Sequence, residues 1–247
     1  MLFEGATWVA ASQIVFSVLD IGGIFCAAIL GGMVARKMHF DIVGFVVVSI
    51  ISALGGGILR DLMLQQGPPV ALTNKLYLAA AILGAVISYL LRMRGKVWDR
   101  VFIAFDAFVV GAWSATGAIK ALEAGLGWVP AIMLGVTTAV GGGMIRDISV
   151  GVVPAVFGGN TLYATSSILA TIPAIVLWQL HHPSAGMILA TIVGGAICIA
   201  AQSYGWRLPV NYDFSAYEAL RTRVRGRKSG GVRGDSAIPD DDRPAES

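Results

Sequence analysis

Two copies of the pattern Gly-Gly-Gly-x-x-Arg-Asp place an arginine and an aspartate inside otherwise apolar segments. The copies occupy residues 55–61 and 141–147. Two more carboxylates, Asp20 and Asp106, also interrupt apolar runs. Carboxylates held in an apolar interior attract cations and repel anions. These residues therefore predict a path or a binding site for a cation.

The charges within the apolar segments do not balance. They are Asp20, Arg60, Asp61, Asp106, Arg146 and Asp147. Four aspartates against two arginines leave a formal surplus of two negative charges. An ionised group at the centre of a membrane helix costs about 2.5 to 3.5 kcal/mol, so we expect the six groups to face one another or water. The alternative is that they neutralise one another and only hold helices together.

Pairing within one motif is not expected, because neighbouring residues of a helix point about 100° apart. We expect crossed ion pairs between the motifs instead, Arg60 with Asp147 and Arg146 with Asp61. Two carboxylates stay unmatched in this arrangement.

The glycine triplets predict a kink or an interruption in each helix. They are Gly55, Gly56, Gly57, Gly141, Gly142 and Gly143. Glycine in a helix costs about 0.8 to 1 kcal/mol relative to alanine, so the two triplets together forgo about 5 kcal/mol. An interrupted helix frees carbonyls and helix ends to line a water-filled path. The alternative is close packing of helices through small residues.

The composition identifies the environment that positions these residues. Of 247 residues, 56% are hydrophobic and 13% are charged, whereas a soluble domain carries about 25% charged residues. Residues 148–206 contain no Asp, Glu, Lys or Arg, and that length holds at least two membrane spans of about 20 residues each. The sequence therefore predicts an all-α membrane protein.

Seven apolar runs predict seven transmembrane helices. They cover residues 10–35, 42–64, 71–91, 101–119, 128–150, 160–180 and 186–206. Most of the tryptophans fall at the ends of these runs, where an indole prefers the headgroup level. Lysine and arginine gather in the loops of one side, and this bias places the N-terminus outside and the C-terminus in the cytoplasm.

An internal repeat relates two halves of the chain. A shift of 86 residues superimposes Asp20 on Asp106, Tyr77 on Tyr163 and the first glycine motif on the second. Each copy holds three predicted spans, and an odd number makes the second copy enter the membrane from the opposite side. We expect inverted repeats with an ion or substrate site at their interface. The predicted parts are repeats at residues 7–91 and 97–180, a seventh helix at 186–206 and a tail at 207–247.

The tail and the remaining polar residues predict no nucleic-acid partner, cofactor or enzyme activity. Residues 207–247 carry eight of the 18 Lys and Arg, mixed with seven Asp and Glu, which suits a basic segment on anionic lipid followed by a disordered end. Cys26 and Cys198 lie in apolar runs and are expected to be packing thiols. Lys120 either ends the fourth span or lies in the membrane field and senses voltage.

The doubled motif in a chain of three plus three plus one spans resembles the prokaryotic members of the trimeric intracellular cation (TRIC) channel family, also described as glycine-transporter-like membrane domains. The resemblance covers about residues 7–206. It implies a homotrimer in a prokaryotic inner membrane, with a pore in each protomer that conducts potassium and sodium. The glycine triplets would kink the second and fifth spans, with the Arg-Asp pairs beside the pore.

Two other classes remain open at this point. Inverted repeats are common in secondary transporters, so a carrier of a small amino acid such as glycine is the main alternative. A structural scaffold is the third, although it gives the charges inside the membrane no use. Small-residue patches at Gly31-Gly32 and at Gly111 with Gly117 permit close helix contacts and favour an oligomer.

Overall fold

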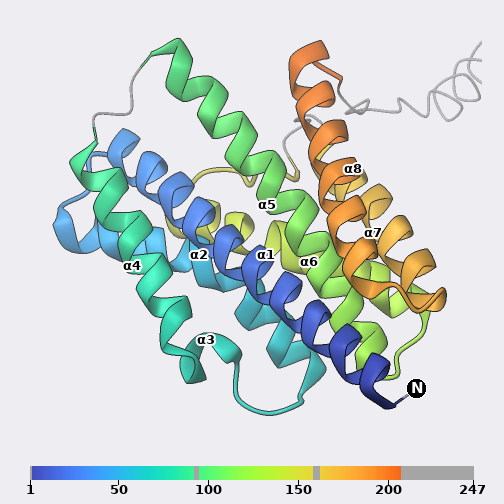
Figure 1. Ribbon diagram of the computed structural model, residues 1–247. Coiled ribbons are helices and arrows are strands. Elements are labelled where there is room, and N and C mark those ends of the chain that lie inside the picture. The colour runs from blue at the N-terminus through green and yellow to red at the C-terminus, as the bar shows by residue number, and fades with distance from the viewer. Residues whose placement is uncertain (1, 92–94, 158–161, 207–247) are drawn as a thin grey trace, which may run out of the picture. The chain divides into compact units, whose positions relative to one another are not determined.

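The computed structural model describes residues 2–91, 95–157 and 162–206, with side chains from residue 13 onward. The described residues belong to the first of the two units into which the chain divides, Met1–Leu208 and Pro209–Ser247. The second unit, and with it the predicted basic tail, lies outside the described residues. The described part of the first unit consists of helices joined by turns and short loops (Figure 1).

Eight helices make up the described part of the chain. They are α1 (Leu2–Lys37), α2 (Ile42–Leu64), α3 (Val70–Thr73), α4 (Lys75–Leu90), α5 (Lys96–Glu123), α6 (Trp128–Ser149), α7 (Tyr163–Gln179) and α8 (Pro183–Tyr204). Each of the seven predicted runs forms a helix, and α2 has the predicted bounds. The third run begins differently, because the Asn74 side chain accepts a hydrogen bond from Leu76 N at 3.0 Å and caps α4, which leaves α3 as a separate turn of helix.

Five of the helices are long and apolar enough to cross a membrane. These segments are Gln13–Lys37, Ile42–Leu64, Lys96–Glu123, Trp128–Ser149 and Pro183–Tyr204. The helices α4 and α7 are apolar but shorter, with 16 and 17 residues, against about 20 for a full span. The prediction of an all-α membrane protein is confirmed, while the crossing of α4 and α7 stays a prediction.

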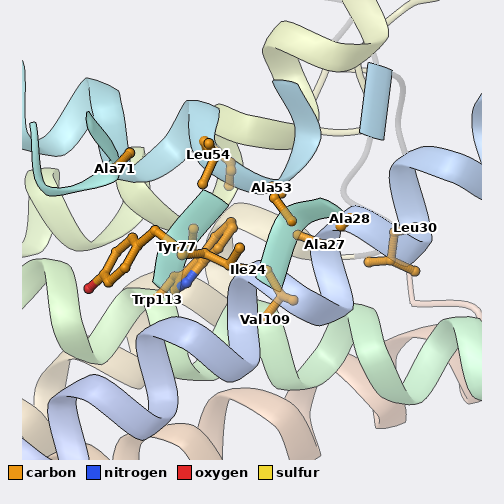
Figure 2. Close-up of a cluster of buried hydrophobic side chains, with 13 residues drawn as sticks. Ile24, Ala27, Ala28, Leu30, Ala53, Leu54, Ala71, Tyr77, Val109 and Trp113 are labelled. Carbon is orange, nitrogen blue, oxygen red and sulfur yellow. The ribbon is translucent and has the colours of Figure 1, made fainter. Parts of the chain in front are cut away.

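The helices pack in two groups that meet at α1, α2, α5 and α6. Helix α1 packs on α2 and α4, and α5 packs on α6, α7 and α8, with further contacts between α1 and α5 and between α2 and α6. In Figure 1, α1 and α5 cross the front of the view with α2 and α6 behind them. A buried cluster at this junction includes Ile24, Tyr77 and Trp113 (Figure 2).

The small-residue patches pack inside the chain. A Cβ on Gly31 would lie 2.7 Å from Cβ of Ser52 in α2, and one on Gly117 would lie 2.8 Å from the Leu134 oxygen in α6. A Cβ on Gly111 would clash with the Thr191 carbonyl of α8. These glycines therefore bring helices of one chain together, which removes the argument that they favour an oligomer.

Candidate functional site

Helices α2 and α6 cross at the middle of the glycine triplets. A Cβ on Gly56 would clash with the Thr138 carbonyl oxygen, and one on Gly142 would lie 2.5 Å from the Ser52 oxygen. Only glycine permits backbones to approach this closely. Both helices continue through their triplets, so the predicted interruption is wrong and close packing explains the middle glycines. A bend within a continuous helix stays a prediction.

The third glycine of each triplet has a different environment. A Cβ on Gly57 would meet no atom nearer than Arg60 Nη2, at 3.8 Å, and one on Gly143 would meet Arg146 Nη2 at 3.6 Å. Neither glycine is therefore needed for helix packing. Each instead leaves space beside a guanidinium group and lines a cavity.

The first cluster of charges, which we call the first site, consists of Asp20, Arg60, Asp61 and Tyr77. The Arg60 side chain is 0% exposed. Its Nε donates to Asp61 Oδ1 at 2.9 Å, and its Nη2 lies 3.3 Å from Asp20 Oδ2. Tyr77 donates its hydroxyl to the same Asp20 oxygen at 2.7 Å. The backbone N–H of Val70 donates to Asp61 Oδ2 at 2.9 Å. Each of the two carboxylates therefore accepts hydrogen bonds from two different residues.

The second cluster, or second site, consists of Asp106, Arg146, Asp147 and Tyr163. Arg146 Nε donates to Asp147 Oδ1 at 2.8 Å, and the Tyr163 hydroxyl donates to Asp106 Oδ1 at 2.8 Å. These two contacts repeat those of the first site at an offset of 86 residues. The sequence repeat is therefore matched by a repeat of contacts.

The two sites differ in the partners of Asp20 and Asp106, which are the aspartates in the first helix of each half. Asp20 is ion-paired with Arg60, whereas Asp106 accepts a hydrogen bond from Gln202 Nε2 of α8 at 3.3 Å. Arg146 Nη1 donates to Ser52 Oγ at 3.4 Å instead. Helix α8 lies outside the duplicated segments, so it supplies a partner that the first site lacks.

The predicted crossed ion pairs are wrong. Each arginine pairs with the aspartate that follows it, and Arg60 also pairs with Asp20. The physical reason is the shape of the guanidinium group, a planar fork with five donors at the end of a long side chain. One edge of the fork serves the neighbouring carboxylate while the other reaches a different helix, so the direction of Cβ does not decide the pairing.

Lys120 changes the charge balance. Its Nζ lies 3.7 Å from Asp61 Oδ1 and 5.2 Å from the centroid of the Phe16 ring. The first site then holds two carboxylates and the cations of Arg60 and Lys120, so its formal net charge is zero. The second site holds two carboxylates against Arg146. The formal surplus is therefore one negative charge, and it lies at the second site.

In the described part of the chain, three cavities border these charges. The second site lines a cavity of about 380 Å³ together with Gly143 and Gln202. The first site borders a cavity of only about 10 Å³, which Trp113 also lines. A third cavity, of about 110 Å³, is lined by Asp61 and Lys120. The largest has room for a hydrated cation, whereas about 10 Å³ suffices for a single water.

Sequence reasoning missed three residues of these sites, Tyr77, Tyr163 and Gln202, and named Lys120 without tying it to a carboxylate. Tyr77 and Tyr163 match each other in the repeat, which could have marked them as partners of the two repeated aspartates. Gln202 lies outside the repeat, and Lys120 lies at the end of a span, so no sequence pattern tied either to a carboxylate. Among the described residues, no group of three or more His, Cys, Asp or Glu could hold a metal ion.

An apolar bundle of helices around two internal charge clusters defines a polytopic membrane protein of the class that contains channels and carriers. The chain belongs to the prokaryotic TRIC channel family, whose model is described as "Glycine transporter". That model matches it twice, at residues 17–93 and 103–179. The two matches start 86 residues apart, the same offset as in the sequence and in the contacts.

The relatives are bacterial membrane proteins. A UPF0126 membrane protein of Deinococcus radiodurans is 33% identical over 167 residues, which cover 67% of this chain and 73% of that protein. The UPF0126 inner membrane protein YadS of Escherichia coli K12 is 32% identical over 155 residues, covering 62% of this chain and 74% of that protein.

Solved structures with the same fold are cation channels by name. One, from work on conductance through TRIC cation channels, is 29% identical with a TM-score of 0.71, over 78% of this chain and 96% of that one. The TRIC orthologue from Rhodobacter sphaeroides is 30% identical with a TM-score of 0.68, over 77% of this chain and 96% of that one. The resemblance expected from the doubled motif is confirmed.

Proposed function

We propose that this protein is a monovalent cation channel that conducts potassium and sodium. The observation that carries the proposal is the second site, where a surplus carboxylate borders a cavity of about 380 Å³ next to the crossing of α2 and α6. A single negative charge in a water-filled cavity of low dielectric surroundings favours cations over anions. The names of the structural neighbours point the same way.

The proposed path runs through one protomer, along α2 and α6. It leads from the second-site cavity past the first site to the third cavity. Asp61 lines both of the last two cavities, and the hydrogen bond from Arg146 to Ser52 links the second site to α2 just before its glycines. The narrowest point of this path is the first site.

The proposed assembly follows the family. We place seven membrane spans in the chain, arranged as inverted repeats at residues 7–91 and 97–180 with the seventh helix at 186–206. The protein is proposed to form a homotrimer in a bacterial inner membrane, with the N-terminus outside and the C-terminus in the cytoplasm. The repeated match to the family model and the repeated contacts support the duplication.

We also propose Lys120 as a voltage-sensing residue. Its side chain is 21% exposed, and its 3.7 Å contact with Asp61 is longer than those of Arg60. One charge crossing the whole membrane field gains about 2.3 kcal/mol per 100 mV. A lysine held by this long contact and by the Phe16 ring at the third cavity is therefore the charge that we expect a membrane potential to move most readily.

Recordings from purified protein in planar bilayers under a KCl gradient test the function. We expect unitary current steps and a reversal potential near the potassium equilibrium value, with little discrimination against sodium, because diffuse charge rather than a carbonyl ring provides the selectivity. A reversal potential near the chloride value would contradict the charge count at the second site.

The second candidate is a secondary transporter of a small amino acid, favoured by the description of the matching family model. A carrier shows saturable uptake and counterflow of labelled glycine in proteoliposomes and no unitary current. A channel shows the reverse, so the two assays on one preparation separate the candidates.

A further inference from the structure

The first and second sites use equivalent residues but enclose very different volumes. Each has two aspartates, an arginine, a tyrosine and the third glycine of a triplet. The cavity measures about 10 Å³ at the first site and about 380 Å³ at the second. The charged residues are of the same types, but the lining of the smaller cavity includes a bulky side chain that the lining of the larger one does not.

That side chain is Trp113 of α5. Its indole is 2% exposed and lines the first-site cavity together with Arg60 and Tyr77. Figure 2 shows the ring beside Tyr77 and Ile24. The residue 86 positions earlier in the repeat is Ala27, so the equivalent position of the other half carries a methyl group where this half carries an indole.

The indole rests on Gly23 of α1. A Cβ on Gly23 would clash with Trp113 Nε1 and would lie 2.9 Å from Cε2, so any larger residue there displaces the ring. The equivalent of Gly23 in the second half is Val109. The sequence therefore pairs a small residue with a large one, Gly23 with Trp113, and the sizes are reversed in the equivalent pair, Val109 with Ala27.

The indole N–H of Trp113 is not tied to this position by a hydrogen bond. Its Nε1 is buried and has no hydrogen-bond partner, and this holds for no other buried side-chain nitrogen or oxygen that the structure describes. A buried donor without an acceptor costs free energy, and a wider, hydrated path would supply water as the acceptor. Packing alone holds the ring in place, and its polar edge favours the hydrated arrangement.

We propose that Trp113 is the plug of the cation path. With its indole on Gly23 the first site is closed, and displacement of the indole joins the second-site cavity to the third cavity at Asp61. This inference rests on the proposed channel function. It assigns the closing role to one side chain of the second half, which the repeat does not duplicate.

Bilayer recordings of Trp113→Ala test the plug. The packing of a buried tryptophan favours the closed arrangement by far more than the free energy of a tenfold change, so we expect the mean potassium current per protein to rise at least about tenfold. Trp113→Phe keeps an aromatic ring on Gly23 and is expected to stay near the wild-type current. Val109→Ala, an equally buried truncation on the same helix, is the matched control.

A chemical measurement separates the plug from the channel function. Leu54 lines the first-site cavity, and Leu54→Cys, in a background without Cys26 and Cys198, can be modified in liposomes by a positively charged, water-soluble thiol reagent. Trp113→Ala is expected to raise the modification rate whether or not current is recorded. If wild type carries no current but the rate rises, the function fails and the plug stands.

Two outcomes overturn the plug. One is an unchanged modification rate in Trp113→Ala, whatever the current. The other is a rise in current or rate that Val109→Ala produces equally, since the effect would then be general loosening. Should Trp113→Ala not elute as the wild type does on size exclusion, Trp113→Leu is used with the same expectations, because it keeps an apolar but smaller side chain on Gly23.

Discussion

Replacing Arg60 by Ala is expected to destabilise the protein more than replacing Arg146 by Ala, although the two arginines match in the repeat. Arg60 is 0% exposed and pairs with Asp20 and Asp61. Without it, Asp20, which is 2% exposed, keeps the Tyr77 hydroxyl as its remaining partner in the described part of the chain. Removing one partner of a buried ion pair costs about 3 to 5 kcal/mol.

The loss of Arg146 is expected to cost less. Its side chain is 12% exposed, and it forms an ion pair with Asp147. Asp147 borders the cavity of about 380 Å³ and also accepts a hydrogen bond from Ala155 N at 3.2 Å. Water and the backbone can therefore solvate the stranded carboxylate, and the loss approaches that of one ordinary hydrogen bond, about 1 kcal/mol.

Thermal inactivation in detergent measures this difference. Each variant is heated, and the fraction that still elutes as a single species is followed by fluorescence-detected size exclusion. Arg60→Ala should lose this species at a lower temperature than Arg146→Ala. Adding Asp20→Asn should restore part of the stability of Arg60→Ala, because it removes the stranded charge. Adding Asp106→Asn to Arg146→Ala should not, since the structure does not pair these two residues.

Two results would refute this reasoning. Equal losses for the two arginine variants would mean that burial does not set the cost. Recovery of Arg60→Ala by Asp147→Asn, but not by Asp20→Asn, would mean that the ion pairs cross between the motifs after all.

Three further predictions follow from the sites. Gly56→Ala should lower the free energy of unfolding by about 1 to 3 kcal/mol, the usual cost of overpacking, because its Cβ meets the Thr138 carbonyl. In size exclusion after heating, the single species should be lost at a lower temperature than in the wild type. Asp106→Asn should move the reversal potential under a KCl gradient toward zero, because it removes the surplus negative charge of the second site. Lys120→Gln should flatten the dependence of open probability on voltage in bilayer recordings.

A matched variant serves as the control for each substitution. Gly57→Ala should be tolerated, because its Cβ would come no nearer to another atom than 3.8 Å, to Arg60 Nη2, and equal losses at Gly56 and Gly57 would contradict the packing argument. Ser203→Ala, an exposed change on α8, should leave selectivity intact, and an unchanged reversal potential in Asp106→Asn would place the selective charge elsewhere. Lys75→Gln is the control for Lys120→Gln, and an unaltered voltage dependence would exclude Lys120 as the sensor.

Composition and periodicity predict the helices well because membrane helices are defined by their own residues. The apolar run at residues 42–64 became α2 with the same bounds, and the offset of 86 recurs in the Tyr77–Asp20 and Tyr163–Asp106 contacts. Both signals are local or repeated, so one sequence contains them in full. The break between α3 and α4 at Asn74 could also have been predicted, since asparagine is a preferred N-cap.

The pairing of the charges and the shape of the cavities could not be predicted from the sequence. The direction of Cβ suggested that Arg60 and Asp61 do not pair, but the reach of the guanidinium fork decided otherwise. The closed first site depends on how Trp113 packs against Gly23 across two helices. Neither residue belongs to the motif, and their contact joins the two halves, so no pattern within one half contains it.

The hydrogen bond from Gln202 to Asp106 bears on the choice between channel and carrier. A carrier that alternates by exchanging the conformations of two matched halves works best when its outward-facing and inward-facing states are close in free energy. Here α8 supplies an amide to one half, and the corresponding aspartate of the other half holds a guanidinium. Exchange would break unlike interactions in the two directions, so the two arrangements would differ in free energy, which weighs against a carrier of this kind.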